Sequence, residues 1–403
     1  MSKPLLSKRV LGMVEAATLG MAAAAAAKTA QGHRVLNLSI GEPDFDTPAH
    51  IKDAAKKALD DGYTSYTPVQ GLPVLREAIC EKFKRDNDLD FEPNQIAVSC
   101  GAKQSLANIM LAMLDPGDEV ILPAPYWVSY TSLITQAAGV PVTIRTDVGA
   151  DFKITPDELE QAITVKTRLF LFSNPCNPTG SVYSRDELRA LAEIVVSYGG
   201  LFVVSDEIYE YIHFGGADED GHVSIGALDG MRDRTITVNG FSKGFAMTGW
   251  RLGYLGGPEW LARAVAKVQG QFTSGAAAFS QVAAAHALRS DLAASYAMRD
   301  TYRRRRDQVM SGLSEIPGIE TTRPQGAFYS FSDVSSYYGK RVGERVIKGS
   351  EDFCRYLLDE ANVATVPGAA FGDDRCFRIS FAASDADLKE ALERIKGALA
   401  ALQ

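Results

Sequence analysis

From about residue 95 the sequence alternates between short apolar runs and longer segments with helical periodicity. The apolar runs are typical of buried strands and lie at 95–99, 119–123, 167–173, 201–207 and 234–240. Segments such as 103–114 and 184–200 lie between these runs and have the pattern of helices. This alternation predicts an α/β fold with a mostly parallel sheet that helices cover on both faces.

The chain has 403 residues, a length that allows about two or three domain-sized cores. We expect a large domain over 49–295 and a smaller α+β domain over 296–403. A long helical stretch at 291–313 leaves the large domain, and the strand-like sequences "GAFYSFSDV" and "CFRISFAAS" follow it. We expect residues 1–48 to form an N-terminal segment that packs with the small domain.

Charge, histidine spacing and cysteine spacing argue against several classes of function. A formal charge of −8 argues against a nucleic-acid partner, because nucleic-acid surfaces are normally basic. The five histidines have no metal-ligand spacing, so we predict no metal site. The five cysteines form no Cys-x-x-Cys pair, which favours a reduced, cytoplasmic protein without disulfides. They are Cys80, Cys100, Cys176, Cys354 and Cys376.

The N-terminal stretch "SKRVLGMVEAATLGMAAAAAAKTAQ" has basic residues before an alanine-rich run, as a secretory signal peptide does. Glu15 interrupts the run, and alanine is a strong helix former with little hydrophobicity. We therefore predict a helix here, with a signal peptide as the alternative. No stretch has the roughly 20 strongly apolar residues of a membrane span, so we predict no membrane partner.

Polar or glycine-rich sequences directly follow the strand-like runs. They are "SCGAKQ", "SNPCNPTG", "SDEIY" and "NGFSKG". The carboxyl ends of parallel strands meet at one edge of a sheet, which is where α/β proteins bind ligands. We therefore expect these sequences to face one cleft.

Lys243 lies between Ser242 and Gly244, and Arg251 follows eight residues later. On its own Lys243 reads as an ordinary exposed lysine, but small neighbours also let a ligand approach the amine. A lysine amine can attack a carbonyl to form a Schiff base, and an arginine fork suits a phosphate. A Schiff-base lysine together with a phosphate-binding arginine is the combination that pyridoxal phosphate requires.

Asp206 and Tyr209 in "SDEIY" and Asn177 in "SNPCNPTG" suit the ring of the same cofactor. Pyridoxal phosphate withdraws electrons only when its ring nitrogen stays protonated, and a carboxylate such as Asp206 holds that proton. Tyr209 can donate to the ring hydroxyl oxygen. A turn-capping acid and a packed aromatic are the ordinary roles of such residues. Two Asn-Pro pairs form a rigid turn that aims Asn177.

Gly101 and Ala102 stand at a strand-to-helix turn, where free N–H groups and the helix dipole favour a phosphate. Any α/β protein has several such turns. Trp127 offers a flat face on which a cofactor ring can stack, although a tryptophan is more often part of a core. Each of these signals gains weight only together with the others.

Together these residues resemble the class I/II aminotransferases, which are fold-type-I pyridoxal-phosphate enzymes. The stretches "NPCNPTG", "SDEIY", "SKGFAMTGWRLGY" and "FRISFA" occur here in the order and approximate spacing of that family. The resemblance covers the chain from about residue 5 to its end. It implies a large domain with a seven-stranded, mostly parallel sheet, a smaller α+β domain, and a homodimer with shared active sites.

The resemblance also implies a role for each matching residue. Lys243 becomes the catalytic lysine that forms the Schiff base. The implied cofactor-binding residues are Gly101, Ala102, Lys103, Trp127, Asn177, Asp206, Tyr209, Ser242, Arg251 and, from the partner subunit, Tyr66. The implied substrate-binding residues are Thr18, Gly41, Lys103, Trp127, Asn177, Arg378 and, from the partner subunit, Ser274. Among the substrate-binding residues, Arg378 binds the α-carboxylate.

Within the family the sequence is most similar to the bacterial and plant-plastid aspartate aminotransferases, through "GEPDFDTP", "GAKQ", "PYWVSY" and "FAMTGWR". In that group Lys103 recognises the side-chain carboxylate of aspartate or glutamate, with help from Thr18. Ala16 replaces an expected serine, which weakens the expected dicarboxylate site. Val14 replaces a lysine linked to prephenate use, which makes prephenate an unfavoured substrate. The implied substrates are L-aspartate or L-glutamate with 2-oxoglutarate or oxaloacetate.

Other functions stay open at this point. One alternative is transfer from aromatic or neutral amino acids, and another is β-elimination on the same fold, because the scaffold supports several outcomes. A non-catalytic regulatory protein is a third, although no DNA-binding segment accompanies the motifs and Lys243 and Asp206 are both present. For Cys100 and Cys176, beside the cofactor loops, we expect packing roles.

Overall fold

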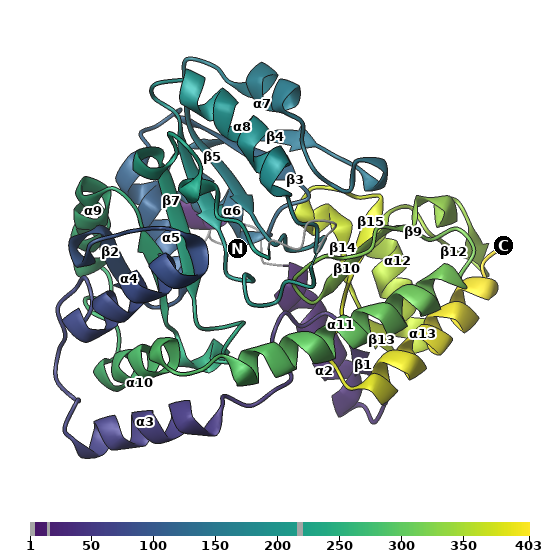
Figure 1. Ribbon diagram of the computed structural model, residues 1–403. Coiled ribbons are helices and arrows are strands. Elements are labelled where there is room, and N and C mark those ends of the chain that lie inside the picture. Colours follow the sequence, from purple (N-terminus) through teal and green to yellow (C-terminus); the bar gives the residue numbers. More distant parts are fainter. Residues whose placement is uncertain (1–4, 14–16, 216–220) are drawn as a thin grey trace.

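The computed structural model describes residues 5–13, 17–215 and 221–403, and its centre is a seven-stranded sheet (Figure 1). The strand order is β2-β8-β7-β6-β5-β3-β4. β8 runs antiparallel to both of its neighbours, and the other pairs are parallel. The predicted α/β fold with a mostly parallel seven-stranded sheet is therefore confirmed.

The strands are short and almost entirely buried, apart from the edge strand β4. They are β2 Ile96–Ser99, β3 Glu119–Ala124, β4 Val140–Arg145, β5 Thr167–Ser173, β6 Phe202–Asp206, β7 Thr235–Gly240 and β8 Gly253–Gly256. In register, Ser173 at the end of β5 pairs with Asp206 at the end of β6, and Asp206 pairs with Val238 of β7. The polar residues that follow these strands therefore start at one edge of the sheet.

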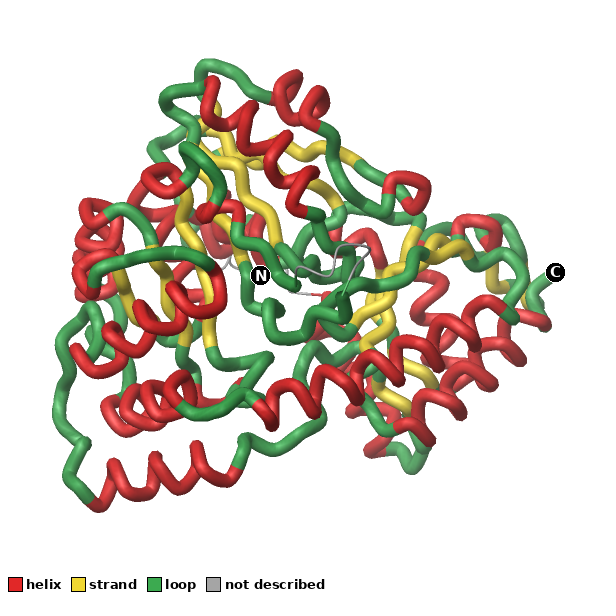
Figure 2. The backbone as a smooth tube through the Cα atoms, in the orientation of Figure 1, coloured by secondary structure: helices red, strands yellow, loops and turns green. Residues whose placement is uncertain are grey.

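Helices cover both faces of this sheet (Figure 2). In β5, Leu169 and Leu171 pack with helices α5, α6 and α9, whereas Phe170 and Phe172 pack with α7 and α8 on the other face. Alternate residues of a strand point to opposite faces, so a continuous apolar run fits a sheet covered on both sides. The helices of this part are α3 Ala49–Asp60, α4 Pro73–Asn87, α5 Ala102–Met113, α6 Ser129–Gln136, α7 Pro156–Ala162, α8 Arg185–Ser197, α9 Glu259–Gly270 and α10 Ala278–Arg289.

The C-terminal part contains a four-stranded antiparallel sheet in the order β14-β15-β10-β9. The strands of this sheet are β9 Glu320–Thr321, β10 Tyr329–Asp333, β14 Val366–Pro367 and β15 Cys376–Ser380. The helices of the C-terminal part are α11 Ala293–Ser314, α12 Ser350–Tyr356 and α13 Asp385–Ala400. Two further strands, β11 Arg341–Val342 and β12 Arg345–Val346, form a small hairpin. The domain boundaries at residues 48 and 295 stay a prediction.

The N-terminal segment forms the short helix α1 Lys8–Leu11 and the helix α2 Ala17–Ala30, as the alanine-rich sequence predicts. Strand β1 Leu36–Asn37 then pairs in parallel with β13 Val363–Ala364. Val14 and Ala16, the two departures from the family pattern, lie outside the described residues. Within the described ranges, no helix is both long enough and apolar enough to cross a membrane.

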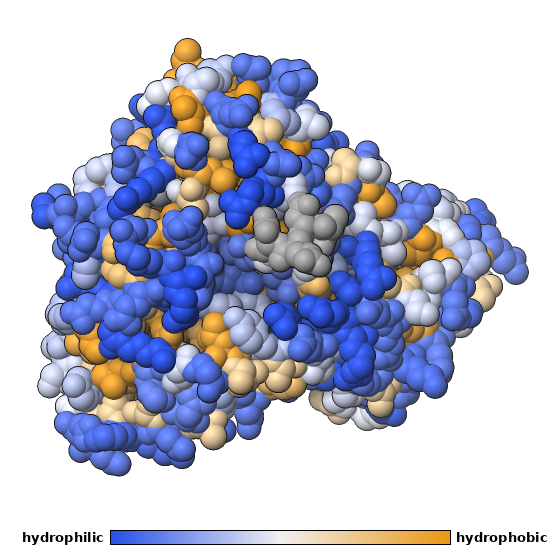
Figure 3. Space-filling model, viewed as in Figure 1, coloured by the Kyte–Doolittle hydropathy of each residue, from blue (hydrophilic) through white to orange (hydrophobic). Residues whose placement is uncertain are grey.

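The surface is mostly polar. On the face shown in Figure 3, hydrophilic residues dominate and apolar residues lie scattered among them. This distribution fits a sequence in which 23% of the residues are charged.

Candidate active site

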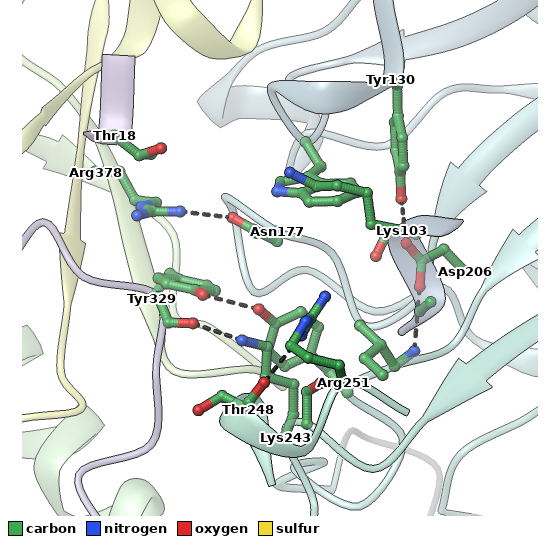
Figure 4. A pocket seen from close by; sticks show the side chains of 17 residues that line it. Thr18, Lys103, Tyr130, Asn177, Asp206, Lys243, Thr248, Arg251, Tyr329 and Arg378 are labelled. Atoms are coloured by element: carbon green, nitrogen blue, oxygen red, sulfur yellow. Dashed lines mark hydrogen bonds between the residues drawn. The ribbon is translucent and has the colours of Figure 1, made fainter. Parts of the chain in front are cut away.

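A cavity of about 290 Å³ lies at the carboxyl ends of β5, β6 and β7, between the large sheet and the C-terminal sheet. The predicted site residues that line it are Thr18, Gly41, Ala102, Lys103, Trp127, Asn177, Asp206, Tyr209, Ser242, Lys243, Arg251 and Arg378. Figure 4 shows Thr18 and Arg378 on one side and Lys103 and Asp206 on the other. The fold thus brings together residues from both ends of the chain.

Lys243 follows β7 and enters the cavity from below in Figure 4. Its Nζ donates a hydrogen bond of 2.5 Å to the carbonyl oxygen of Gly41. Burial lowers the pKa of the Lys243 amine to about 8; the charge of Glu42 opposes the shift, while that of Arg378 adds to it. The pKa shift leaves a useful fraction of neutral amine near neutral pH, as a nucleophilic lysine requires.

Asp206 is the last residue of β6 and is 4% exposed. Its carboxylate accepts hydrogen bonds from the Tyr130 hydroxyl at 2.7 Å and from the Ile208 amide at 3.3 Å. Burial raises the pKa of Asp206 to about 6, and the Tyr130 hydrogen bond opposes this rise. Among the described residues no cation forms an ion pair with Asp206, so a ligand with a protonated nitrogen would neutralise it.

The start of α5 and Arg251 form the cationic end of the cavity. Gly101 caps α5 with φ +92°, and a Cβ at this position would lie 2.7 Å from Arg251 Nη2. Glycine is thus required here both for the backbone conformation and for the close approach of the guanidinium. The first-turn amides of a helix have no intrahelical acceptor, so this corner suits a phosphate.

Lys103, in the first turn of α5, lies beside this end. Its Nζ stands 5.0 Å from the centre of the Trp127 ring. Burial, followed by the like charge of Arg251, lowers the pKa of Lys103. An anionic ligand would relieve both effects.

Arg378 belongs to β15 and is 2% exposed. Its guanidinium donates to the Asn177 side-chain oxygen at 3.0 Å and to the Ser39 carbonyl oxygen at 2.8 Å. It also stacks over the Tyr329 ring, 4.3 Å from the ring centre. Its buried Nε has no hydrogen-bond acceptor among the described residues. A buried guanidinium with donors to spare is suited to binding a carboxylate.

The comparisons with known proteins agree with this geometry. The sequence model for "Aminotransferase class I and II" matches residues 33–395. The chain belongs to this aminotransferase family. It is 49% identical over 402 residues to the "Bifunctional aspartate aminotransferase and glutamate/aspartate-prephenate aminotransferase" of Petunia hybrida, covering 99% of this chain and 83% of that protein.

Two solved structures of this aminotransferase family are also closely similar. The aspartate aminotransferase from Rhizobium meliloti has a TM-score of 0.95 and 44% identity, covering 99% of each chain. The aspartate aminotransferase from Thermus thermophilus with maleate has a TM-score of 0.90 and 41% identity, covering 98% of this chain and 99% of that one. Aminotransferases of this family depend on pyridoxal phosphate, so the predicted cofactor is confirmed.

The residues of the cavity fit this aminotransferase cofactor. Asp206 is a buried carboxylate without a cationic partner among the described residues, as a protonated ring nitrogen needs. Gly101 leaves room beside Arg251 and a helix N-terminus for a phosphate. Lys243 supplies an amine whose pKa is lowered by burial.

Sequence reasoning missed Tyr130, Thr248 and Tyr329, which also line the cavity of this aminotransferase. The hydroxyls of Tyr329 and Tyr209 lie 2.8 Å apart, and a Cβ on Gly41 would lie 2.6 Å from the Tyr329 hydroxyl. Thr248 accepts a hydrogen bond from Arg251 Nη1 through its carbonyl oxygen at 2.9 Å. Tyr130 stands in "PYWVSY" and Tyr329 in "GAFYSF", but neither stretch marks the tyrosine as a site residue.

Tyr66 and Ser274 do not line the cavity of their own aminotransferase chain. Tyr66 is fully exposed, and Ser274 is exposed in a loop with φ +58°. Thr67 Oγ1 donates to the Ala276 carbonyl oxygen at 3.1 Å, so the two loops lie side by side on one surface. Their predicted roles in a partner subunit stay predictions.

The two cysteines near the cofactor loops of this aminotransferase have different surroundings. Cys100 is half-buried and packs with the core formed by α4, α10 and β8. Burial raises the pKa of the Cys176 thiol, which keeps the thiol protonated and therefore unreactive. Both environments agree with the expected packing roles.

Proposed function

We propose that the protein transfers the amino group between L-aspartate or L-glutamate and 2-oxoglutarate or oxaloacetate, in two half-reactions at Lys243. The observation that carries this proposal is the placement of Arg378 and Lys103 in the same cavity as Lys243. Two separate cations suit the two carboxylates of these substrates. The names of the similar proteins from Petunia hybrida and Rhizobium meliloti include aspartate, and the Thermus thermophilus structure contains maleate, a dicarboxylate.

Specific residues would hold the cofactor. Asp206 would face the ring nitrogen, Trp127 would stack on the ring, and Tyr209 would donate to the ring hydroxyl oxygen. Asn177 would donate to the same oxygen through its amide nitrogen, because its side-chain oxygen already accepts from Arg378. Gly101, Ala102, Ser242 and Arg251 would hold the phosphate, and Lys103 lies beside that end of the cavity. Pyridoxal phosphate, when bound, withdraws electrons from the bonds of the substrate's α-carbon.

Lys243 is the residue that moves the proton in this proposal. Near neutral pH a fraction of its amine is neutral, since burial lowers its pKa to about 8. The neutral amine takes the proton from the substrate's α-carbon as a general base, which typically contributes about 10²–10⁴-fold to a rate. The Gly41 carbonyl oxygen, 2.5 Å from Nζ, holds the amine in the cavity.

Arg378 binds the α-carboxylate in this proposal, and the backbone at Gly41 assists. Lys103 binds the side-chain carboxylate from the opposite side of the cavity, and Thr18, on the same side as Arg378, assists. A hydrogen bond to a charged group contributes about 1.5–3 kcal/mol, so each carboxylate contact matters for selection among amino acids. The unfavoured use of prephenate, inferred from Val14, stays a prediction because Val14 lies outside the described residues.

The proposal includes a cytoplasmic homodimer with shared active sites. Tyr66 and, with 69% exposure, Phe272 are exposed aromatic residues on the adjoining loops that also carry Ser274. Exposed clusters of large apolar residues mark interaction surfaces. In a homodimer Tyr66 of the partner subunit would bind the phosphate and Ser274 of the partner subunit would assist at the substrate carboxylate. The five unpaired thiols support a reducing location.

Mixed dimers test the shared sites. Lys243→Ala and Tyr66→Ala variants are each expected to be nearly inactive alone. After the two are mixed and allowed to exchange subunits, one site per mixed dimer regains both residues, so activity returns. Mixtures that stay inactive although subunit exchange is demonstrated would contradict the sharing of sites.

Substrate selection tests the proposed reaction. The parent protein is assayed with 2-oxoglutarate and either L-aspartate or L-phenylalanine, next to Lys103→Met and a control, Lys166→Met, at an exposed lysine. We expect Lys103→Met to lower kcat/KM for aspartate by about 10–100-fold, with little change for phenylalanine, because one charged hydrogen bond is lost. A parent protein that does not use aspartate or glutamate would contradict the proposed function.

A further inference from the structure

The segment 206–210 presents side chains in two opposite directions. Asp206 (Figure 4) and Tyr209 line the active-site cavity. Glu207 and Glu210 face the other way and are 0% and 6% exposed. They meet further buried polar residues there. We name this group the rear cluster; its members are Lys82, Asn87, Glu207, Glu210, His222 and Ser224.

Glu207 is held from several elements at once. Its carboxylate accepts hydrogen bonds from the Ser205 hydroxyl at 2.8 Å and from the Ser224 hydroxyl at 2.5 Å. The His222 Nε2 atom lies 2.9 Å from the same carboxylate, and the Asn87 amide donates to it at 3.3 Å. A carboxylate with this many partners has one defined position.

Glu210 is held from helix α4. Its carboxylate lies 2.5 Å from the Nζ of Lys82, which is fully buried, and it accepts from the Asn87 amide at 2.9 Å. Lys82 also donates to the Asn87 side-chain oxygen at 2.5 Å. The ligand atoms of Glu207, Glu210 and His222 lie within 4.8 Å of one another, as in a metal site, but the Lys82 ammonium already supplies the cation.

Folding alone does not require this arrangement. Replacing a buried ion pair by apolar side chains of similar size is often neutral or stabilising, because burying charges carries a large desolvation penalty. The hydrogen bonds of a buried polar network fix the directions of the side chains that they join, whereas apolar packing fixes directions less strictly. The side chains fixed here belong to Glu207 and Glu210, the chain neighbours of Asp206 and Tyr209. The Glu210 amide also donates to the Glu207 carbonyl oxygen at 3.0 Å.

We propose that the rear cluster is a positioning device for the cofactor-binding side of the same segment. By fixing Glu207 and Glu210, it fixes the Asp206 carboxylate opposite the cofactor's ring nitrogen and the Tyr209 hydroxyl opposite the ring oxygen. The members of the rear cluster are positioning residues, since the hydrogen bonds of the Asp206 and Tyr209 side chains go to Tyr130, Ile208 and Tyr329 and not to the cluster. The inference rests on the proposed roles of Asp206 and Tyr209.

The charge of Glu207 adds to this effect. Burial is the main cause of the raised pKa of the Asp206 carboxyl, and the like charge of Glu207 adds to this rise. Ser205, Ser224 and Asn87 donate hydrogen bonds to the Glu207 carboxylate, and these bonds stabilise its negative charge. The rear cluster thus orients Asp206 and moderates the repulsion that it experiences.

The test compares Glu207→Gln with the parent protein and with a control, Glu193→Gln, at an exposed position of α8. The dissociation constant of pyridoxal phosphate is measured with cofactor-free protein, and the visible circular dichroism of the bound cofactor reports its orientation. At metal sites, removing a residue that orients a ligand side chain from behind typically weakens affinity by about 10–100-fold. We therefore expect at least about tenfold weaker binding and a changed dichroism for Glu207→Gln. Glu193→Gln is expected to match the parent.

A milder variant covers the case in which Glu207→Gln does not fold. Ser224→Ala removes one hydroxyl donor to Glu207 and leaves all charges in place. Weaker cofactor binding with a changed dichroism in Ser224→Ala supports the inference. A lower melting temperature with unchanged affinity and dichroism in the folded variants overturns it, because the rear cluster then acts on stability alone. A parent protein that gives no visible band with pyridoxal phosphate overturns the proposed function as well.

Discussion

The Tyr130 hydroxyl donates a 2.7 Å hydrogen bond to Asp206, and both side chains are buried. Tyr130 lies on α6 and Asp206 ends β6, so the bond joins two elements that are far apart in the sequence. It stabilises the ionised carboxylate against the effect of burial, which raises the pKa of Asp206 to about 6. The proposed pairing of Asp206 with a protonated ring nitrogen needs that ionised form.

Tyr130→Phe is expected to raise the pKa of Asp206 further. Cofactor affinity of the parent should fall as the pH decreases through about 6, because Asp206 becomes protonated. In Tyr130→Phe the same fall should begin at higher pH. The measurement is the dissociation constant of pyridoxal phosphate over about pH 5–8. Tyr296→Phe, at a half-exposed position on α11, is the control, and identical pH profiles for all proteins would contradict the role of Tyr130.

The lowered pKa of Lys243 predicts how fast the cofactor attaches. Only the neutral amine can attack a carbonyl, and burial moves its pKa from 10.5 to about 8. The neutral fraction therefore rises as the pH increases through about 8. The rate at which cofactor-free protein develops the visible band should rise with a midpoint near that pH. A midpoint close to that of an ordinary lysine would contradict the proposed environment.

Arg378→Lys is expected to raise KM for L-aspartate by about 10–100-fold, because a lysine cannot reproduce the planar fork. Lysine also lacks the geometry to contact Asn177 and Ser39 together. The affinity for pyridoxal phosphate should change little. Steady-state kinetics with L-aspartate measure the effect, and Arg355→Lys, at an exposed arginine of α12, is the control. An unchanged KM in Arg378→Lys would exclude Arg378 as the carboxylate ligand.

Arg305 connects the C-terminal part to the loop that carries Gly41. Its guanidinium donates to Asp44 at 2.8 Å and to Asp385 at 3.0 Å, and its side chain is 9% exposed. Arg305→Met should lower the free energy of unfolding by about 1–2 kcal/mol, because Asp44 loses the largely buried cation that pairs with it and Asp385 keeps only the exposed Arg304. Arg305→Met should also raise KM for L-aspartate, since the loop that carries Gly41 loses its ion pair with the C-terminal part.

The neighbouring Arg304 is the matched control for this prediction. Its side chain is 59% exposed and pairs with Asp385, and exposed ion pairs contribute only about 0–1 kcal/mol. The midpoint of thermal unfolding and KM for L-aspartate are measured for Arg304→Met and Arg305→Met and compared with those of the parent protein. If Arg304→Met and Arg305→Met behave alike, Arg305 has no special role in supporting the loop.

The sequence predicted the residues whose signal is local. Asp206 ends the buried strand β6 and Lys243 comes shortly after the buried strand β7, so the rules for α/β sheets place them at one edge. Helix α8 was equally predictable, since Ser184 and Glu187 form a capping box at its start. Such features depend on residues within a few positions of one another.

The features that the sequence did not reveal depend on contacts between distant segments. Tyr130 bonds to Asp206 across 76 positions, and Tyr329 meets Tyr209 across 120. Lys82 has charged neighbours in the sequence and reads as an exposed residue of α4, yet it is fully buried against Glu210. No local pattern identifies the partner in these cases, because the fold alone brings the segments together.

Visible absorption spectroscopy tests whether Lys243 carries out both half-reactions. The spectrum of the purified protein is recorded with pyridoxal phosphate, then after addition of L-aspartate, and then after addition of 2-oxoglutarate. We expect a visible band that falls when L-aspartate is added and returns when 2-oxoglutarate follows, and we expect no such band in Lys243→Ala. A band that does not respond to L-aspartate or L-glutamate would contradict the proposed transfer between these dicarboxylates. The absence of a band in the parent protein would contradict the role of Lys243 itself.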